Sequence, residues 1–190
     1  MYTRKYKVNR QKVHYVKFDK DTYLLESLTE YAINNKIKTA EISFIGAVQN
    51  LNVVYFNQET KEYEDHFFEG GFEVLSGLGN ITLFENKPLV HIHISVSDKD
   101  GKAFGGHLVN GTKIWLIEAI IKQPTFIGKN YINRYFDEEL CLNVWNDYDK
   151  EFPLILNPPS TVSISPVIQP ASSEHRKYTA SAISSGSPSF

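Results

Sequence analysis

Between Val90 and Ser97 the chain alternates strictly between apolar and polar side chains. Because side chains on a β-strand point to its two faces in turn, this alternation predicts a strand with one apolar and one polar face. The polar face carries His91, His93, Ser95 and Ser97. The two histidines therefore do not share the apolar core. They either form a row that faces solvent or line a site against another element or another subunit.

A third histidine follows a short way along the chain. His107 comes directly after Gly105 and Gly106, which lack side chains, so the backbone that carries it can approach its neighbours closely. We expect a tight turn here that delivers this imidazole to His91 and His93. Three nitrogen ligands with an open position are the protein contribution expected of an open zinc site. The three histidines are thus candidate ligands for zinc or another divalent transition metal, and the alternative is a hydrogen-bonded polar cluster at a subunit interface.

The first part of the chain predicts a hairpin followed by a helix. Residues 2–8 and 13–18 have strand character and flank a polar turn at 9–12. Asp21 can cap the helix, which should end at 34–36. Apolar residues at helical spacing define its buried face, namely Leu24, Leu25, Leu28, Tyr31 and Ala32.

The middle of the chain is dominated by strand patterns. Residues rich in β-branched and aromatic side chains predict strands at 40–48, 51–56, 63–68, 72–83 and 89–97. Residues 57–60 should form the turn between the second and third of these. A further apolar strand is expected at 114–121, buried on both faces.

Composition limits the class of protein. The single cysteine, Cys141, excludes an internal disulfide and a Cys-x-x-Cys motif, and we expect it in the core. The polar N-terminal residues do not suggest a signal peptide, and no apolar run approaches the roughly 18 residues of a membrane span. The expected compartment is the cytoplasm, without a membrane partner.

The C-terminal residues differ from the rest. The last 34 residues hold ten serines and five of the eight prolines, which is incompatible with a regular helix. We therefore predict a domain over residues 1–150 and a Ser/Pro-rich tail over 151–190, flexible or docked on a neighbour.

Positive charge is concentrated at the N-terminus, although the chain as a whole has a net charge of -2. Such a basic edge could contact nucleic acid or an acidic partner, or could be the solvated face of a strand pair. The candidate residues for a nucleic-acid contact are Arg4, Lys5, Lys7, Arg10 and Lys12.

Several motifs, in the same order, resemble the plants and prokaryotes conserved (PPC) domain family. The stretch from Gly101 to Gly111, which contains Gly105-Gly106-His107-Leu108, is similar to the signature of this family. Phe44-Ile45-Gly46-Ala47-Val48 resembles its early glycine turn, and Phe72-Glu73-Val74-Leu75-Ser76 resembles a Phe-Glu-Ile-Leu-Ser strand. The resemblance covers roughly residues 1 to 145.

The resemblance implies an α+β fold, with a largely antiparallel sheet, one main flanking helix and assembly as a homotrimer. Prokaryotic members are often described as DNA-binding by analogy with plant relatives, in which a separate AT-hook grips the minor groove. The AT-hook core, Arg-Gly-Arg-Pro, does not occur in this chain. Some prokaryotic relatives bind a metal through histidines that match His91, His93 and His107.

Two functions follow as hypotheses. The first is an oligomeric binding module that associates with DNA or a regulatory protein and carries the three-histidine metal site. The alternative is a zinc-dependent small-molecule-binding protein or an enzyme of unknown reaction. An enzyme would need a general base near the metal, and the candidates are Glu73, Asp98, Asp100 and Glu118.

Overall fold

The computed structural model describes residues 5–127 and 131–146. In chain order its elements are β1 (Val8–Phe18), α1 (Leu24–Asn34), β2 (Ala40–Asn57), β3 (Glu62–Phe84), β4 (Lys87–Ser97), β5 (Ala103–Leu108), β6 (Ile114–Phe126), β7 (Arg134–Asp137) and β8 (Leu142–Trp145). The predicted tail at 151–190 and the candidate residue Arg4 lie outside the described residues. Within the described ranges, no helix is long and apolar enough to span a membrane.

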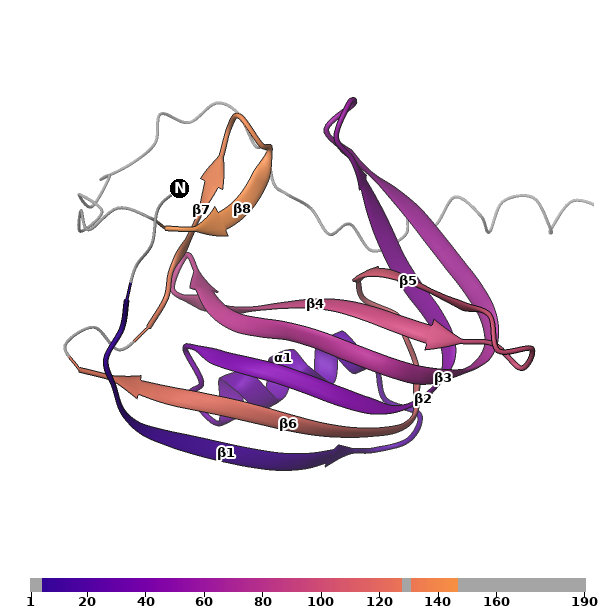
Figure 1. The fold of residues 1–190 in the computed structure, drawn as a ribbon, viewed down its shortest axis with the longest axis horizontal. Helices are drawn as coiled ribbons and strands as arrows, with labels where there is room; N and C mark the ends of the chain where they lie inside the picture. The colour runs from indigo at the N-terminus through magenta and orange to yellow at the C-terminus, as the bar shows by residue number, and fades with distance from the viewer. Residues whose placement is uncertain (1–4, 128–130, 147–190) are drawn as a thin grey trace, which may run out of the picture. The chain divides into compact units, whose positions relative to one another are not determined.

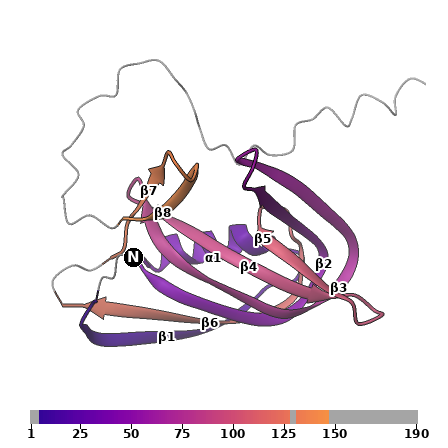
Figure 2. The ribbon, with the colours of Figure 1, turned by 45° about the horizontal axis from the view of Figure 1, so that its top comes forward.

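Six strands form one curved antiparallel sheet in the order β1-β6-β2-β3-β4-β5, with α1 against its concave side (Figures 1 and 2). The helix is amphipathic and buries Leu24, Leu25, Leu28 and Ala32 in the core between itself and the sheet. The second half of β2 also pairs with β5, so that β2, β3, β4 and β5 close into a ring. The predicted antiparallel sheet with one main helix is confirmed.

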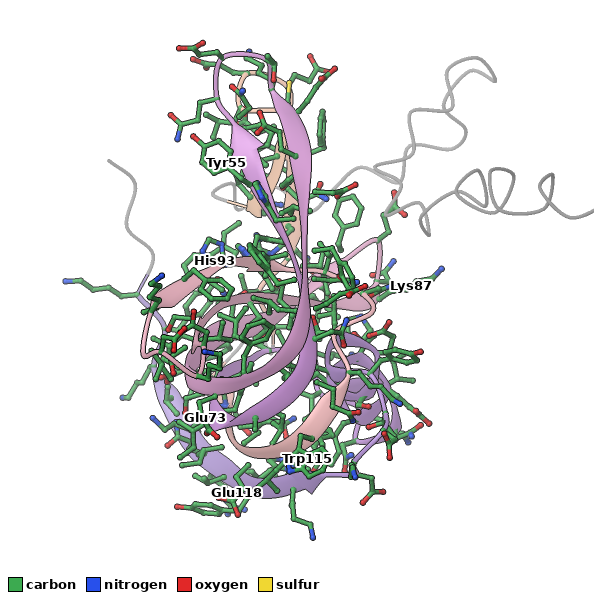
Figure 3. All side chains as sticks on the ribbon, turned by 90° about the vertical axis from the view of Figure 1, so that its right-hand side faces the viewer. Tyr55, Glu73, Lys87, His93, Trp115 and Glu118 are labelled. Carbon is green, nitrogen blue, oxygen red and sulfur yellow. The ribbon has the colours of Figure 1, made fainter. Side chains whose placement is uncertain are left out.

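The strands β2 and β3 are much longer than predicted. Residues 40–48 and 51–56 belong to one continuous strand, and so do residues 63–68 and 72–83. Their far ends project from the sheet as a hairpin, which we call the arm (residues 52–67; Figures 1 and 3). The turn of the arm lies where the sequence predicts it, and Asn57 Oδ1 accepts hydrogen bonds there from the backbone N–H groups of Glu59 and Thr60.

The predicted N-terminal hairpin is wrong. Residues 9–12 do not turn but continue β1, which pairs along its length with β6. A bulge between Val8 and Arg10 adjusts the register. Because β1 is an edge strand with exposed side chains at this end, a polar run is compatible with a strand there.

The predicted helix is confirmed, but its predicted cap is wrong. Tyr23 occupies the N-cap position and makes no side-chain capping bond. Asp21 has a left-handed backbone (φ 68), and its carboxylate accepts a hydrogen bond from Gln49 and pairs with Lys113 at 2.9 Å. The carboxylate therefore ties the helix entry to β2 and β6 rather than capping the helix.

Two further core predictions are wrong. The strand β6 is buried on one side only, and a bulge opposite Ala47 and Val48 turns two neighbouring side chains, Trp115 and Leu116, outward. Cys141 lies in the β7–β8 turn with a φ of 55, and its thiol donates to the carbonyl oxygen of Glu138 instead of packing in the core.

Candidate metal centre

The strand β4 presents two of the three histidines from a rigid base. Ile92, Ile94 and Val96 point into the core and are almost fully buried. His91 and His93 therefore lie on the opposite, outward side of the strand, as the alternation predicts, with His93 exposed and His91 half-buried. Since the core residues on either side of His93 cannot move without opening a cavity, packing fixes the backbone positions from which the two imidazoles extend.

His107 reaches the other two histidines from a strand, and the predicted tight turn is wrong. It lies in β5 directly opposite His93 and is also paired with Val54 of β2. Gly105 and Gly106 make this close pairing possible. A Cβ at Gly105 would overlap the carbonyl oxygen of Ile94, and one at Gly106 would lie 3.0 Å from Cβ of Val53.

The three imidazoles face one another. Their ring centroids are 5.1 Å apart for His91 and His93, 4.8 Å for His91 and His107, and 5.4 Å for His93 and His107. One potential ligand nitrogen of each lies within 4.8 Å of the others. Metal–nitrogen bonds of about 2.0–2.1 Å in a tetrahedral site place the nitrogens about 3.3 Å apart. Small side-chain rotations close that difference, so the donor set fits a transition metal.

Two of the imidazoles are held in the neutral form that binds metals. Burial lowers the pKa of His91 to about 3, helped by the neighbouring His107, Arg134 and His93. Burial, with His93 and Arg134, lowers the pKa of His107 to about 4. At neutral pH both rings are therefore uncharged, which is the form of imidazole that binds metals.

Two neighbours of the histidines were not predicted from the sequence. Nη2 of Arg134, in β7, lies 3.2 Å from Nδ1 of His91. The ring of Tyr63, on the arm, lies 6.0 Å from the ring of His107, and burial raises the pKa of its hydroxyl. Both residues are distant from the histidines in the sequence, and although the Tyr63 segment resembles a hairpin of the PPC family, no local signal places either residue beside the histidines.

The four candidate general bases do not join the histidines, and among the described residues the potential ligand cluster contains histidine only. Glu73 and Asp98 line a separate open cleft. In Figure 3, Glu73 and Glu118 lie lower on the sheet than His93. In the β4–β5 turn, Oδ1 of Asp98 accepts hydrogen bonds from the backbone N–H groups of Asp100 and Lys102.

The described basic residues of the N-terminal stretch lie apart from the metal centre. Lys5 and Lys7 precede β1, and Arg10 and Lys12 lie in its exposed half, at the edge of the sheet farthest from β5 in strand order. All four are exposed. The structure thus separates the two candidate sites that the sequence predicts.

Comparison with models of known protein families shows to which family the chain belongs. The model of the Plants and Prokaryotes Conserved (PCC) domain matches residues 6–124, which is more than half of the sequence. The chain belongs to this family. PCC and PPC are two abbreviations for the same domain, so the resemblance to the PPC family is confirmed. No curated protein matches the chain.

Solved structures of other proteins, one of them described as a PPC protein, show the same fold. The metal-containing protein of Archaeoglobus fulgidus is 30% identical, with a TM-score of 0.67 over 77% of this chain and 99% of its own. The PPC protein of Pyrococcus horikoshii is 29% identical, with a TM-score of 0.66 over 77% and 97%. A protein of Bacteroides thetaiotaomicron with a provisional DNA-binding designation is 27% identical, with a TM-score of 0.64 over 77% and 97%.

Proposed function

We propose that this PPC-domain protein binds a divalent transition metal through His91, His93 and His107, with zinc as the first candidate. The observation that carries the proposal is the donor set itself, in which nitrogens of three facing imidazoles lie within 4.8 Å of one another. Imidazole is a favoured ligand of zinc and of neighbouring transition metals. The metal-containing relative from Archaeoglobus fulgidus, which has the same fold, also supports it.

The surroundings support a ligand-binding role. When bound, the metal supplies a Lewis acid with an open position between the three imidazoles. The chain fixes those imidazoles through the buried residues of β4 and the close pairing of β5. Among the described residues, no carboxylate joins them to act as a general base. The site is therefore suited to hold a ligand.

Metal analysis of the purified protein tests this proposal. After saturation with Zn²⁺ and dialysis, we expect one metal per chain in the wild type and none in His107→Ala. The matched control is His66→Ala, because His66 lies on the arm outside the cluster and stacks against Phe68. A wild-type protein without tightly bound metal refutes the proposal, and so does full metal retention by His107→Ala.

We propose further that the protein is a homotrimer. The large apolar side chains that are exposed on the outward side of the sheet include Ile45, Leu75 and Leu78. Leu78 is paired with His93, so this apolar surface adjoins the metal centre. Exposed apolar patches of this kind are typical of subunit contacts. Light scattering should give three times the 21.7 kDa chain mass, and a monomer that persists at high concentration contradicts the trimer.

DNA association is a second candidate function. Lys5, Lys7, Arg10 and Lys12 are all exposed around one edge strand, and the relative from Bacteroides thetaiotaomicron carries a DNA-binding designation. If these four side chains neutralise four phosphates, the affinity for duplex DNA should fall about a hundredfold between 50 and 200 mM salt. Fluorescence anisotropy measures this. An affinity that is weak at low salt and independent of salt rules the candidate out.

A further inference from the structure

Arg134 is a buried cation whose described partners are all neutral. It is only 8% exposed. Its guanidinium donates to Thr82 Oγ1, to the carbonyl oxygen of Asn143 and to Asn80 Oδ1, at 2.7–2.9 Å. Removing a charge from water is costly, so a buried guanidinium is normally paired with a carboxylate. Within the described ranges, the ion pairs of the protein do not include Arg134.

This charge faces the metal centre. Nη2 of Arg134 lies 3.2 Å from Nδ1 of His91. The second nitrogen of a metal-binding histidine normally donates to a carboxylate, a carbonyl or water, whereas here a donor faces it. Among the described residues, the cluster of potential ligands at the metal centre contains histidine and no carboxylate.

A bound divalent metal would add two more positive charges. Three neutral imidazoles compensate none of them, and charges interact more strongly in a partly buried site than in water. A neutral ligand at the open position would leave both the metal and Arg134 uncompensated. An anionic ligand would compensate both at once.

We propose that the open position takes a small oxyanion, of the carboxylate or phosphate class, and that Arg134 selects it over neutral ligands. This inference rests on the proposed metal function. Guanidinium groups favour carboxylate and phosphate partners. Three of the five N–H donors of Arg134 point to Thr82, Asn143 and Asn80, which leaves one on each terminal nitrogen, and Nη2 is the terminal nitrogen that faces His91.

The position of the site favours a small ligand. Tyr63 on the arm lies beside His107, and Arg134 on β7 lies beside His91. Near the tip of the arm, Lys61 Nζ donates to the carbonyl oxygen of Glu139 in the β7–β8 turn at 2.8 Å. The metal centre thus has the arm on one side and the β7–β8 hairpin on the other, and the Lys61 hydrogen bond links the two. Figure 1 shows these two hairpins.

The experiment titrates cobalt-loaded protein with acetate or inorganic phosphate at constant ionic strength and follows the visible absorption of Co²⁺, which reports a change in its ligands. We expect a spectral change in the wild type and in Arg134→Lys, which keeps the charge. In Arg134→Gln the anion affinity should fall at least about tenfold, because one nearby positive charge is lost. The matched control is Lys99→Gln, which removes an exposed charge from the β4–β5 turn and should behave as the wild type.

A titration of the wild type with acetamide, the neutral counterpart of acetate, also tests whether the site selects an anion over a neutral ligand. This measurement does not depend on the stability of any variant. A spectral response to only one of the two anions supports the proposal and identifies the class of ligand. The proposal is overturned if acetamide binds as well as acetate, if Arg134→Gln keeps the wild-type anion affinity, or if neither anion changes the wild-type spectrum. Failure to bind Co²⁺ at all, seen before any anion is added, refutes the proposed metal function instead.

Discussion

Replacing Gly105 with alanine should move His107 away from His93. The added Cβ would overlap the carbonyl oxygen of Ile94 and would lie 2.9 Å from its carbonyl carbon and from Cα of Ser95. Since non-bonded carbon atoms pack at about 3.5–4.0 Å, β4 and β5 must separate locally by about 1 Å. A hydrogen bond stretched by that amount is lost.

The size of the effect follows from the β4–β5 ladder. The ladder runs from Ser97 opposite Ala103 to His93 opposite His107, so Gly105 lies at its centre. Loss of two or three hydrogen bonds at about 1 kcal/mol each lowers the free energy of unfolding by about 2–3 kcal/mol. Because metal ligands must be held within about 0.5 Å of their positions, metal affinity should also fall more than about tenfold.

Urea unfolding of the metal-free protein, followed by tryptophan fluorescence, measures the first effect, and a competition assay for Zn²⁺ measures the second. The matched control is Gly71→Ala, where the added Cβ meets only the carbonyl oxygen of Val48 at 3.8 Å. That variant should change stability by less than about 0.5 kcal/mol or gain slightly. If Gly105→Ala unfolds at the same urea concentration as Gly71→Ala and binds Zn²⁺ equally well, the close pairing does not position His107.

Two further predictions concern the stability of the metal-free protein. The folded pKa values of His91 and His107, about 3 and about 4, lie below the ordinary value of 6.5. The unfolded chain therefore binds more protons between these limits, so stability falls as the pH drops from about 6.5. After a discount for partial exposure, the free energy of unfolding should fall by about 1–2 kcal/mol per histidine between pH 7 and pH 4.5. In His107→Asn, which lacks one of the two histidines, the fall should be smaller by that amount. If His107→Asn loses as much stability as the wild type between pH 7 and pH 4.5, protonation of His107 is not the cause. Ile92→Ala, at a fully buried position between the two β4 histidines, should cost about 2–5 kcal/mol in the same urea assay; a cost below about 1 kcal/mol would show that β4 is not a rigid base.

The histidine-bearing strand could be predicted because its pattern is local. The alternation from Val90 to Val96 needs only the geometry of a strand, and in the structure Ile92, Ile94 and Val96 on its apolar face are buried. The place of His107 in β5, opposite His93, could not be predicted, because register depends on long-range pairing. Adjacent glycines favour a turn as readily as a strand that packs tightly against its neighbours.

The surroundings of the site could not be predicted from the sequence, because they also depend on long-range contacts. Arg134 lies 43 residues from His91 in the sequence, beyond the part matched by the family model. Nothing in Arg134-Tyr135-Phe136-Asp137 distinguishes a surface arginine from one that is buried against β3 and β4. The prediction of an N-terminal hairpin was wrong for the same reason. The polar residues 9–12 resemble a turn, and only their pairing with β6 makes them part of a strand.

Anomalous scattering from crystals of zinc-saturated protein, recorded on both sides of the zinc absorption edge, tests the central claim most directly. We predict one peak per chain, about 2.0–2.1 Å from one nitrogen each of His91, His93 and His107. Absence of a peak there, or a peak bound by other residues while the three imidazoles stay empty, would contradict the three-histidine metal centre.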